Sequence, residues 1–125
     1  MYLDTDQLES APLSNVVSAA QLEALLLSMG ITKDTLVVLY GRDSTAAARA
    51  AVVIMHAGVA DVRLLNGGYQ AWLDAGLPAD TGQVPRRPAT EFGAKIPVHP
   101  EWIIDTEQAK QVLAAQQGRL VRCCL

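Results

Sequence analysis

Apolar residues recur at helical spacing in the stretch between residues 18 and 30. The positions concerned, three and four residues apart, are Leu22, Leu25, Leu26 and Met29. Ser18 stands before this stripe with Gln21 three residues later, which is the pattern of a capping box. Gly30 follows, a residue that readily takes the left-handed conformation which ends a helix. The pattern therefore predicts an amphipathic helix that begins after Ser18 and stops before Gly30.

The next apolar run, Leu36–Tyr40, has five residues and is too short for a typical helix. It predicts a strand buried on both faces, as in a parallel sheet. The polar loop 41–45 follows, and an alanine-rich run then predicts a helix from Ser44 or Thr45 to about His56. Because this helix is apolar almost all round, we expect it to pack on the sheet with little exposed surface.

A second strand is predicted at Asp61–Leu65, where apolar and polar residues alternate. The turn 66–68 contains two glycines, and a short helix follows over Tyr69–Ala75 with Trp72 as its apolar anchor. Residues 1–17 show no period and are expected to be an irregular lead-in. The order of these elements predicts an α/β fold, a parallel sheet with helices on both faces.

Four prolines and two glycines between residues 79 and 100 interrupt any regular pattern. We therefore expect a first domain over residues 1–84, a linker over 85–99, and the start of a second unit over 100–125. Asp105 and Gln108 form a second capping-box pattern in that unit. The helix they introduce carries Ala109, Val112 and Leu113 as its apolar stripe; we expect it to end at Gly118, and Arg119–Val121 to begin a strand.

Composition excludes several classes of function. The net charge of −3 and the absence of any basic cluster larger than Arg86–Arg87 argue against nucleic-acid binding. No apolar run approaches the roughly 18 residues of a membrane-spanning helix. The two cysteines, Cys123 and Cys124, are adjacent and provide neither a disulfide framework nor zinc-ligand spacing. We expect no metal and no cofactor, and the compartment, cytoplasm or periplasm, stays open.

The loop after the first predicted strand is the candidate site, because ligands of α/β sheets bind at the carboxyl ends of strands. Gly41, Arg42, Ser44 and Thr45 could bind an anion through backbone N–H groups, with Arg42 assisting. The alternative is a plain strand-to-helix connection capped by Ser44, which the negative charge of Asp43 favours. His56 and His99 lack ligand neighbours at metal spacing and are expected to be structural or solvated.

One longer motif is specific. It runs VRLLNGGYQAW from Val62 to Trp72 and continues as AGLP from Ala75 to Pro78. Over residues 20–78 the chain resembles the rhodanese-like family of thiosulfate and 3-mercaptopyruvate sulfurtransferases, and residues 102–121 look similar, on fewer residues, to the opening of another such domain. The resemblance implies a tandem arrangement, with a neighbouring rhodanese-like domain of the same chain as partner and a small sulfur donor for the intact protein.

The family places a cysteine directly after the strand, in a pattern like Cys-x-x-Gly-x-Arg. On this sequence those three positions are Gly41, Ser44 and Ala46. The resemblance therefore implies no catalytic residue here: a non-catalytic domain, inactive by itself, of a parent that is a sulfurtransferase. The alternative is a binding or regulatory rhodanese-like module without enzymatic activity. The phosphatases that share this fold need the same cysteine and arginine and are excluded equally.

The resemblance also implies a fragment, because family domains begin with a strand that would precede Met1, and the second unit is only begun. Cys123 and Cys124 do not supply the missing thiol, because no helix N-terminus follows them to lower a thiol pKa. Exposed apolar residues in such a chain lead us to expect aggregation or domain swapping on expression.

Overall fold

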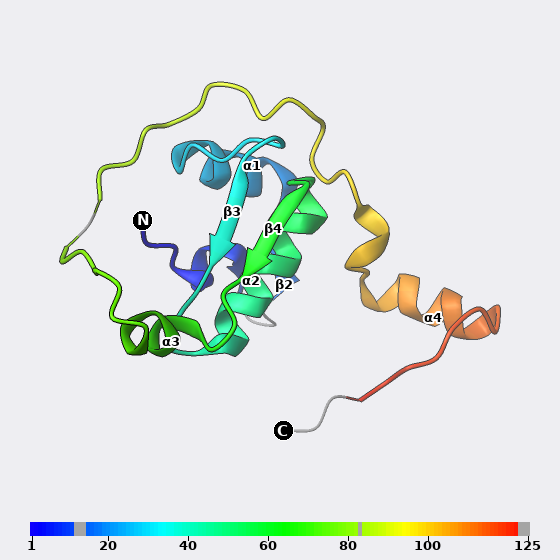
Figure 1. The fold of residues 1–125 in the computed structure, drawn as a ribbon. Coiled ribbons are helices and arrows are strands. Elements are labelled where there is room, and N and C mark those ends of the chain that lie inside the picture. Colours follow the sequence, from blue (N-terminus) through cyan, green and yellow to red (C-terminus); the bar gives the residue numbers. More distant parts are fainter. Residues whose placement is uncertain (12–14, 83, 123–125) are drawn as a thin grey trace.

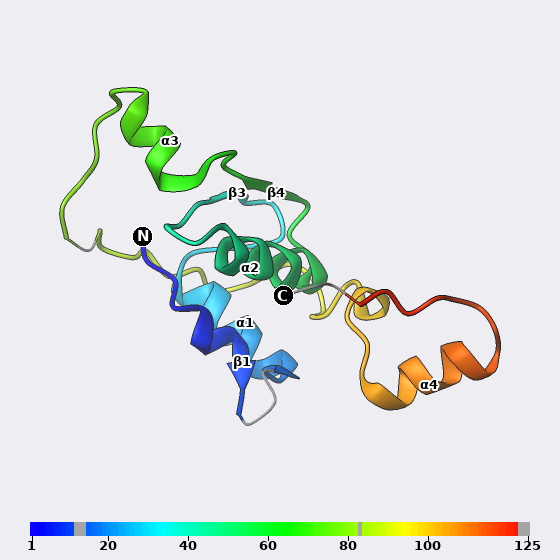
Figure 2. The ribbon, with the colours of Figure 1, turned by 90° about the horizontal axis from the view of Figure 1, so that it is seen from below.

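The computed structural model describes residues 1–11, 15–82 and 84–122, and its centre is a small parallel sheet. Strand β3 (Leu36–Leu39) pairs with β4 (Asp61–Leu64), with Val37 opposite Val62. Helix α2 (Ser44–Ala57) connects the two strands and packs against both. Figures 1 and 2 show α2 between the sheet on one side and the N-terminal elements on the other. The α/β class and the parallel pairing predicted from the sequence are confirmed.

Helix α1 (Ala19–Ser28) forms as its pattern predicts. The Ser18 hydroxyl accepts the Gln21 N–H at 3.3 Å, and the Gln21 side chain accepts the Ser18 N–H at 3.2 Å. Gly30 has φ +74°, the left-handed conformation expected after a helix end. Leu22 and Leu26 on the apolar face of α1 are fully buried in the core.

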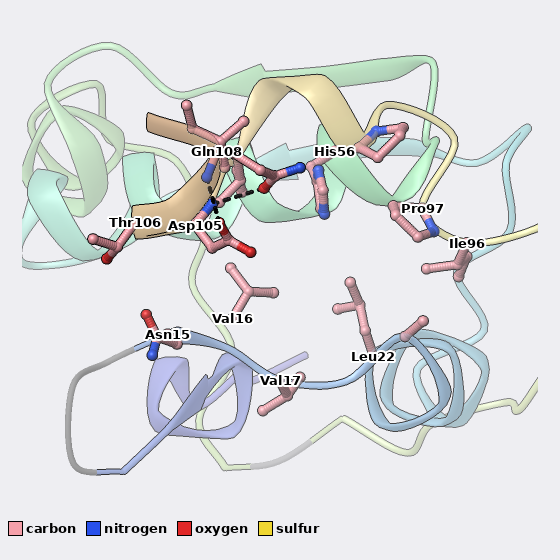
Figure 3. Close-up of a pocket in the computed structure, with 14 residues that line it drawn as sticks. Asn15, Val16, Val17, Leu22, His56, Ile96, Pro97, Asp105, Thr106 and Gln108 are labelled. Atoms are coloured by element: carbon pink, nitrogen blue, oxygen red, sulfur yellow. Dashed lines mark hydrogen bonds between the residues drawn. The ribbon is translucent and has the colours of Figure 1, made fainter. Parts of the chain in front are cut away.

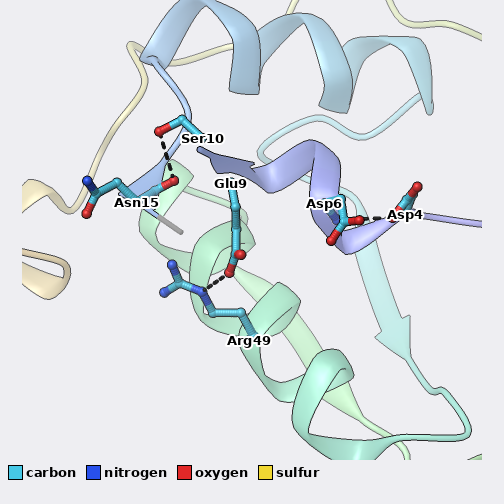
Figure 4. Close-up of polar contacts among 6 residues, drawn as sticks. All are labelled: Asp4, Asp6, Glu9, Ser10, Asn15 and Arg49. Carbon is cyan, nitrogen blue, oxygen red and sulfur yellow. Dashed lines mark hydrogen bonds and ion pairs between the residues drawn. The ribbon is translucent and has the colours of Figure 1, made fainter. Parts of the chain in front are cut away.

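The first 17 residues contain more structure than the expected irregular lead-in. Within their described part, a 3-10 helix η1 (Thr5–Leu8) leads into two short antiparallel strands, β1 (Glu9–Ser10) and β2 (Asn15–Val16). Leu8 is completely buried, and Glu9 forms an ion pair with Arg49 of α2 at 3.1 Å (Figure 4). The prediction failed because single turns and two-residue strands are too short to produce a periodic pattern.

We predicted that strand β3 would be buried on both faces, and this prediction was wrong. Val37 points into the core and is 9% exposed, whereas Leu36 and Val38 on the other face are 52% and 49% exposed. The described sheet has two strands, and α2 covers one of its faces. The apolar run fits a doubly covered strand, but the described residues supply only one cover.

Helix α2 begins at Ser44, as expected, and ends at Ala57, with Gly58 at φ +129°. Six of its residues are buried, but Val52 and Met55 are 45% and 37% exposed. The expectation of little exposed surface was therefore wrong. The sheet and the N-terminal elements cover the rest of the helix surface, and neither of them reaches Val52 and Met55.

Helix α3 (Gly68–Asp74) follows the glycine turn, one residue earlier than predicted. Trp72 is not a core anchor: it is 38% exposed and lies outside the buried cluster. Its indole N–H donates to the carbonyl of Pro78 at 2.9 Å. Trp72 therefore fastens the turn after α3, which passes through Gly76 at φ +70°.

Residues 79–99 contain no helix or strand in their described part, as expected, and arc around the body of the molecule (Figure 1). They do not behave as a detached connector, however. Phe92 and Ile96 are 1% and 5% exposed and belong to the same buried cluster as α1 and α2. The N–H of Lys33 donates to the Phe92 carbonyl at 3.1 Å. The division at residues 84 and 100 stays a prediction.

Helix α4 (Thr106–Ala114) follows the 3-10 turn η2 (Pro100–Trp102) and carries the predicted capping box of Asp105 and Gln108. It ends at Ala114, earlier than the expected Gly118, because the chain turns at Gln116, which has φ +54°. None of its residues is buried. Arg119–Val121 is not a strand in the structure. None of the helices in the described residues is long and apolar enough to cross a membrane.

Candidate functional site

The loop between β3 and α2 holds the four residues that we proposed for an anion, Gly41, Arg42, Ser44 and Thr45. Asp43, between them, is the N-cap of α2, and its carboxylate accepts the Thr45 N–H at 2.8 Å. The capping residue is therefore Asp43, and the prediction of Ser44 was wrong. Aspartate is among the best N-cap residues, so this signal was present in the sequence. A carboxylate thus already occupies the helix N-terminus.

Gly41 sits where the strand turns into the loop, and it is not among the glycines with positive φ. A Cβ added to it would lie 3.2 Å from the Asp43 carbonyl oxygen and 3.9 Å from the Ala47 Cβ. The position therefore accepts a side chain with a shift of a few tenths of an ångström. The backbone does not require glycine at this position; the side chain is absent only because the sequence has glycine there.

The N-terminus of α3 closes over this loop. The Tyr69 N–H donates to the Gly41 carbonyl at 3.3 Å. A Cβ on Gly68 would lie 2.8 Å from the same oxygen, which is too close. Gly68 also has φ +63°, a conformation that other residues rarely adopt, so two independent reasons require glycine there. The rings of Tyr40 and Tyr69 stack with centroids 6.0 Å apart. Sequence reasoning missed this stack, because the two tyrosines lie in separate elements.

A cavity of about 490 Å³ opens beside this loop and along β3. Its floor is made by Ala46, Ala47 and Ala50 of α2, and its walls include residues 38–43, the N-terminal residues 1–3, and Val84. No residue of β4 lines it, so it flanks the edge of β3 that faces away from β4. We call this cavity the β3 groove.

A second cavity of about 520 Å³ lies between the β2–α1 region and residues 96–108 (Figure 3). Its walls are both apolar and polar, and His56 borders it with an exposed fraction of 8%. The His56 Nδ1–H donates to the His99 carbonyl at 2.7 Å, and the Val98 N–H donates to the Ala57 carbonyl at 3.1 Å. His56 therefore has a structural role: it fastens residues 98 and 99 to the end of α2.

His99 is partly buried and stacks on Trp102, with ring centroids 3.9 Å apart. In the part of the chain that the structure describes, no three His, Cys, Asp or Glu side chains gather as metal ligands. Cys123 and Cys124, considered above as a source of the missing thiol, lie outside the described residues.

Comparison with known proteins adds the family context. The model of the rhodanese-like domain matches residues 7–75. Thiosulfate sulfurtransferase YnjE from Escherichia coli is 52% identical over 121 residues, which are 96% of this chain and 28% of that protein. The sulfur carrier protein TtuD from Thermus thermophilus is 39% identical over 77 residues, covering 61% of this chain and 27% of its own length.

Solved structures agree with these matches. The crystal structure of YnjE superposes with a TM-score of 0.84 at 53% identity, covering 89% of this chain and 27% of that one. The wild-type structure of EanB gives a TM-score of 0.82 at 41% identity, covering 90% and 30%. The chain thus spans less than a third of the length of each of these proteins.

Proposed function

This chain belongs to the rhodanese-like domain family, and from that premise we propose that it is a non-catalytic domain of a thiosulfate-type sulfurtransferase. The observation that carries the proposal is Gly41. The family's persulfide cysteine follows the strand directly, and at that position this chain has no side chain at all. Ala46 likewise replaces the family's arginine. No cysteine occurs anywhere before Cys123, so no other element of residues 1–122 can supply the thiol.

The charge of the loop supports the same conclusion. Sulfur transfer from thiosulfate needs a thiolate that attacks the outer sulfur and releases sulfite, and both species are anions. In this loop the Asp43 carboxylate takes the Thr45 N–H at 2.8 Å and adds a negative charge at the helix N-terminus. This arrangement favours the plain strand-to-helix connection over the anion-binding loop. We expect titration with sulfate or thiosulfate to leave the amide NMR signals of residues 41–46 unshifted.

A thiosulfate:cyanide assay tests the inactivity directly. The chain and its Cys123→Ser/Cys124→Ser variant are incubated with both substrates, and thiocyanate is measured. We expect no steady production above a protein-free blank from either protein, and any persulfide only on the two terminal cysteines. Cyanide-dependent turnover by the double variant would overturn the proposal, because that variant contains no cysteine.

The Gly41→Cys variant is the matched control for the site. It restores sulfur at the family position, and the 3.2 Å approach to the Asp43 carbonyl lets the side chain fit with little movement. In the background without Cys123 and Cys124 it carries a single thiol. Mass spectrometry after iodoacetamide should find that thiol labelled, which shows that a cysteine at this position is accessible to small reagents.

In the intact protein, we propose, a neighbouring rhodanese-like domain supplies the cysteine and this domain contributes an interface. YnjE is more than three times as long as the region that matches this chain. The coding region beyond Leu125 tests this part: a further buried strand followed by a cysteine is expected. Its absence would instead favour a binding or regulatory module without enzymatic activity.

A further inference from the structure

The turn between β4 and α3 contains the one Asn-Gly pair of the sequence, Asn66–Gly67, and both residues are exposed. The Gly68 N–H donates to the Leu65 carbonyl at 3.0 Å, which closes the turn. Gly67 has φ +82° and ψ −2°, whereas Asn66 is not among the residues with positive φ. These values define a type II turn with Asn66 and Gly67 as its two central residues.

This turn leaves two groups free that can react with each other. Among the described residues, neither the Gly67 N–H nor the Asn66 side-chain amide makes a hydrogen bond. Gly67 has no Cβ, so nothing on that residue obstructs the approach of the Asn66 side chain to the Gly67 nitrogen. The side-chain carbonyl carbon and this nitrogen are separated by the number of bonds that closes a five-membered ring. The pair therefore has both the atoms and the freedom that ring closure needs.

We propose that Asn66 is a site of spontaneous deamidation in the folded protein. The Gly67 nitrogen gives its proton to solvent and attacks the Asn66 side-chain carbonyl carbon; a C–N bond forms, and the amide nitrogen takes up a proton and leaves as ammonia. Water then opens the resulting succinimide at one of its two carbonyl groups. One opening yields aspartate, and the other yields isoaspartate, in which the chain runs through the former side-chain carboxyl. The net reaction consumes one water and releases one ammonia, with no oxidation or reduction.

Isoaspartate at this position detaches α3 from the loop between β3 and α2. It inserts one carbon into the backbone before Gly67, which lengthens the chain there by up to about 1.5 Å. The Tyr69 N–H donates to the Gly41 carbonyl at 3.3 Å, already the long end of the hydrogen-bond range. Gly68 lies so close to the same oxygen that a Cβ would be 2.8 Å from it. The lengthened turn therefore displaces this contact, whether or not the domain is catalytic.

The chain contains its own control, because Asn15 is the other asparagine of the sequence and Val16 follows it. The full chain is aged at mildly alkaline pH, folded or in urea, then digested at acidic pH and analysed by mass spectrometry. Each conversion raises a peptide mass by about 1 Da, and electron-transfer fragmentation separates isoaspartate from aspartate. In the folded chain we expect Asn66 to convert at least an order of magnitude faster than Asn15, because the branched side chain of Val16 crowds its backbone nitrogen. Equal rates, or an Asn66 that converts only in urea, would overturn the proposal.

Hydrogen exchange at the Tyr69 amide, followed by NMR, tests the effect on α3. We expect faster exchange in the isoaspartate form of the aged chain than in fresh protein. Asn66→Gln should keep the fresh rate after the same ageing, because its longer side chain disfavours ring closure. Fresh Asn66→Asp carries the charge of the product without the extra backbone carbon and should also keep the fresh rate. An isoaspartate form with unchanged exchange, or an Asn66→Asp chain that exchanges equally fast, would refute the detachment of α3 by the lengthened turn.

Discussion

Phe92 offers a direct test of whether residues 85–99 are a connector or part of the core. The side chain is 1% exposed, and its ring lies against the end of α2: a Cβ built on Gly58 would be 3.6 Å from the Phe92 Cε1 atom. The backbone is held as well, because the Lys33 N–H donates to the Phe92 carbonyl at 3.1 Å. The perturbation is Phe92→Ala, which removes the ring and leaves a cavity.

The expected loss follows from the burial. Truncating a fully buried phenylalanine to alanine costs about 3–5 kcal/mol, which is a large share of the roughly 5–15 kcal/mol that stabilises a typical domain. If residues 85–99 were a detached connector, the same change would alter the free energy of unfolding by less than about 0.5 kcal/mol. The two expectations differ several-fold, so the measurement decides between them.

Urea unfolding followed by far-UV circular dichroism measures the difference, with the midpoint and slope fitted separately. Phe92→Leu is included because Phe92→Ala could leave the protein unfolded; it keeps most of the apolar volume and should cost about 1 kcal/mol. Val84→Ala, at a 47% exposed position directly before residues 85–99, is the control and should be nearly neutral. A Phe92→Ala protein as stable as the Val84→Ala control would refute the packing of this segment.

Three further predictions use the same unfolding assay. Gly68→Ala should cost at least about 2 kcal/mol, from its φ of +63° and the 2.8 Å carbonyl contact, and Gly76→Ala, at φ +70° in open space, should cost less; equal losses would contradict the contact. Asp43→Ala should lower the free energy of unfolding by about 0.5–2 kcal/mol, and Ser44→Ala by less than about 0.5 kcal/mol. A larger loss for Ser44→Ala would mean that Ser44 is the N-cap residue. Glu9→Gln should cost about 0.5–1 kcal/mol, a difference that 1 M salt reduces; a salt-independent loss would mean that the ion pair is not its cause.

The elements that could be predicted from the sequence are those held by contacts within a few residues. Both capping boxes join residues three apart, and α1 has its apolar face at spacings of three and four. The parallel pairing of β3 and β4 followed from the length of the connecting helix. At the candidate site, the absence of sulfur at Gly41 is a fact of sequence that folding cannot change.

What the sequence could not decide depends on segments that are far apart in it. The burial of Phe92 requires the irregular stretch to return to α1 and α2, and no local pattern specifies that return. The open face of β3 depends on how many layers surround the sheet, which an apolar run of five residues does not reveal. The need for glycine at position 68 arises from the Gly41 carbonyl, 27 residues earlier. Local sequence determined where α1, α2, β3 and β4 form, and long-range packing determined which of their faces are covered.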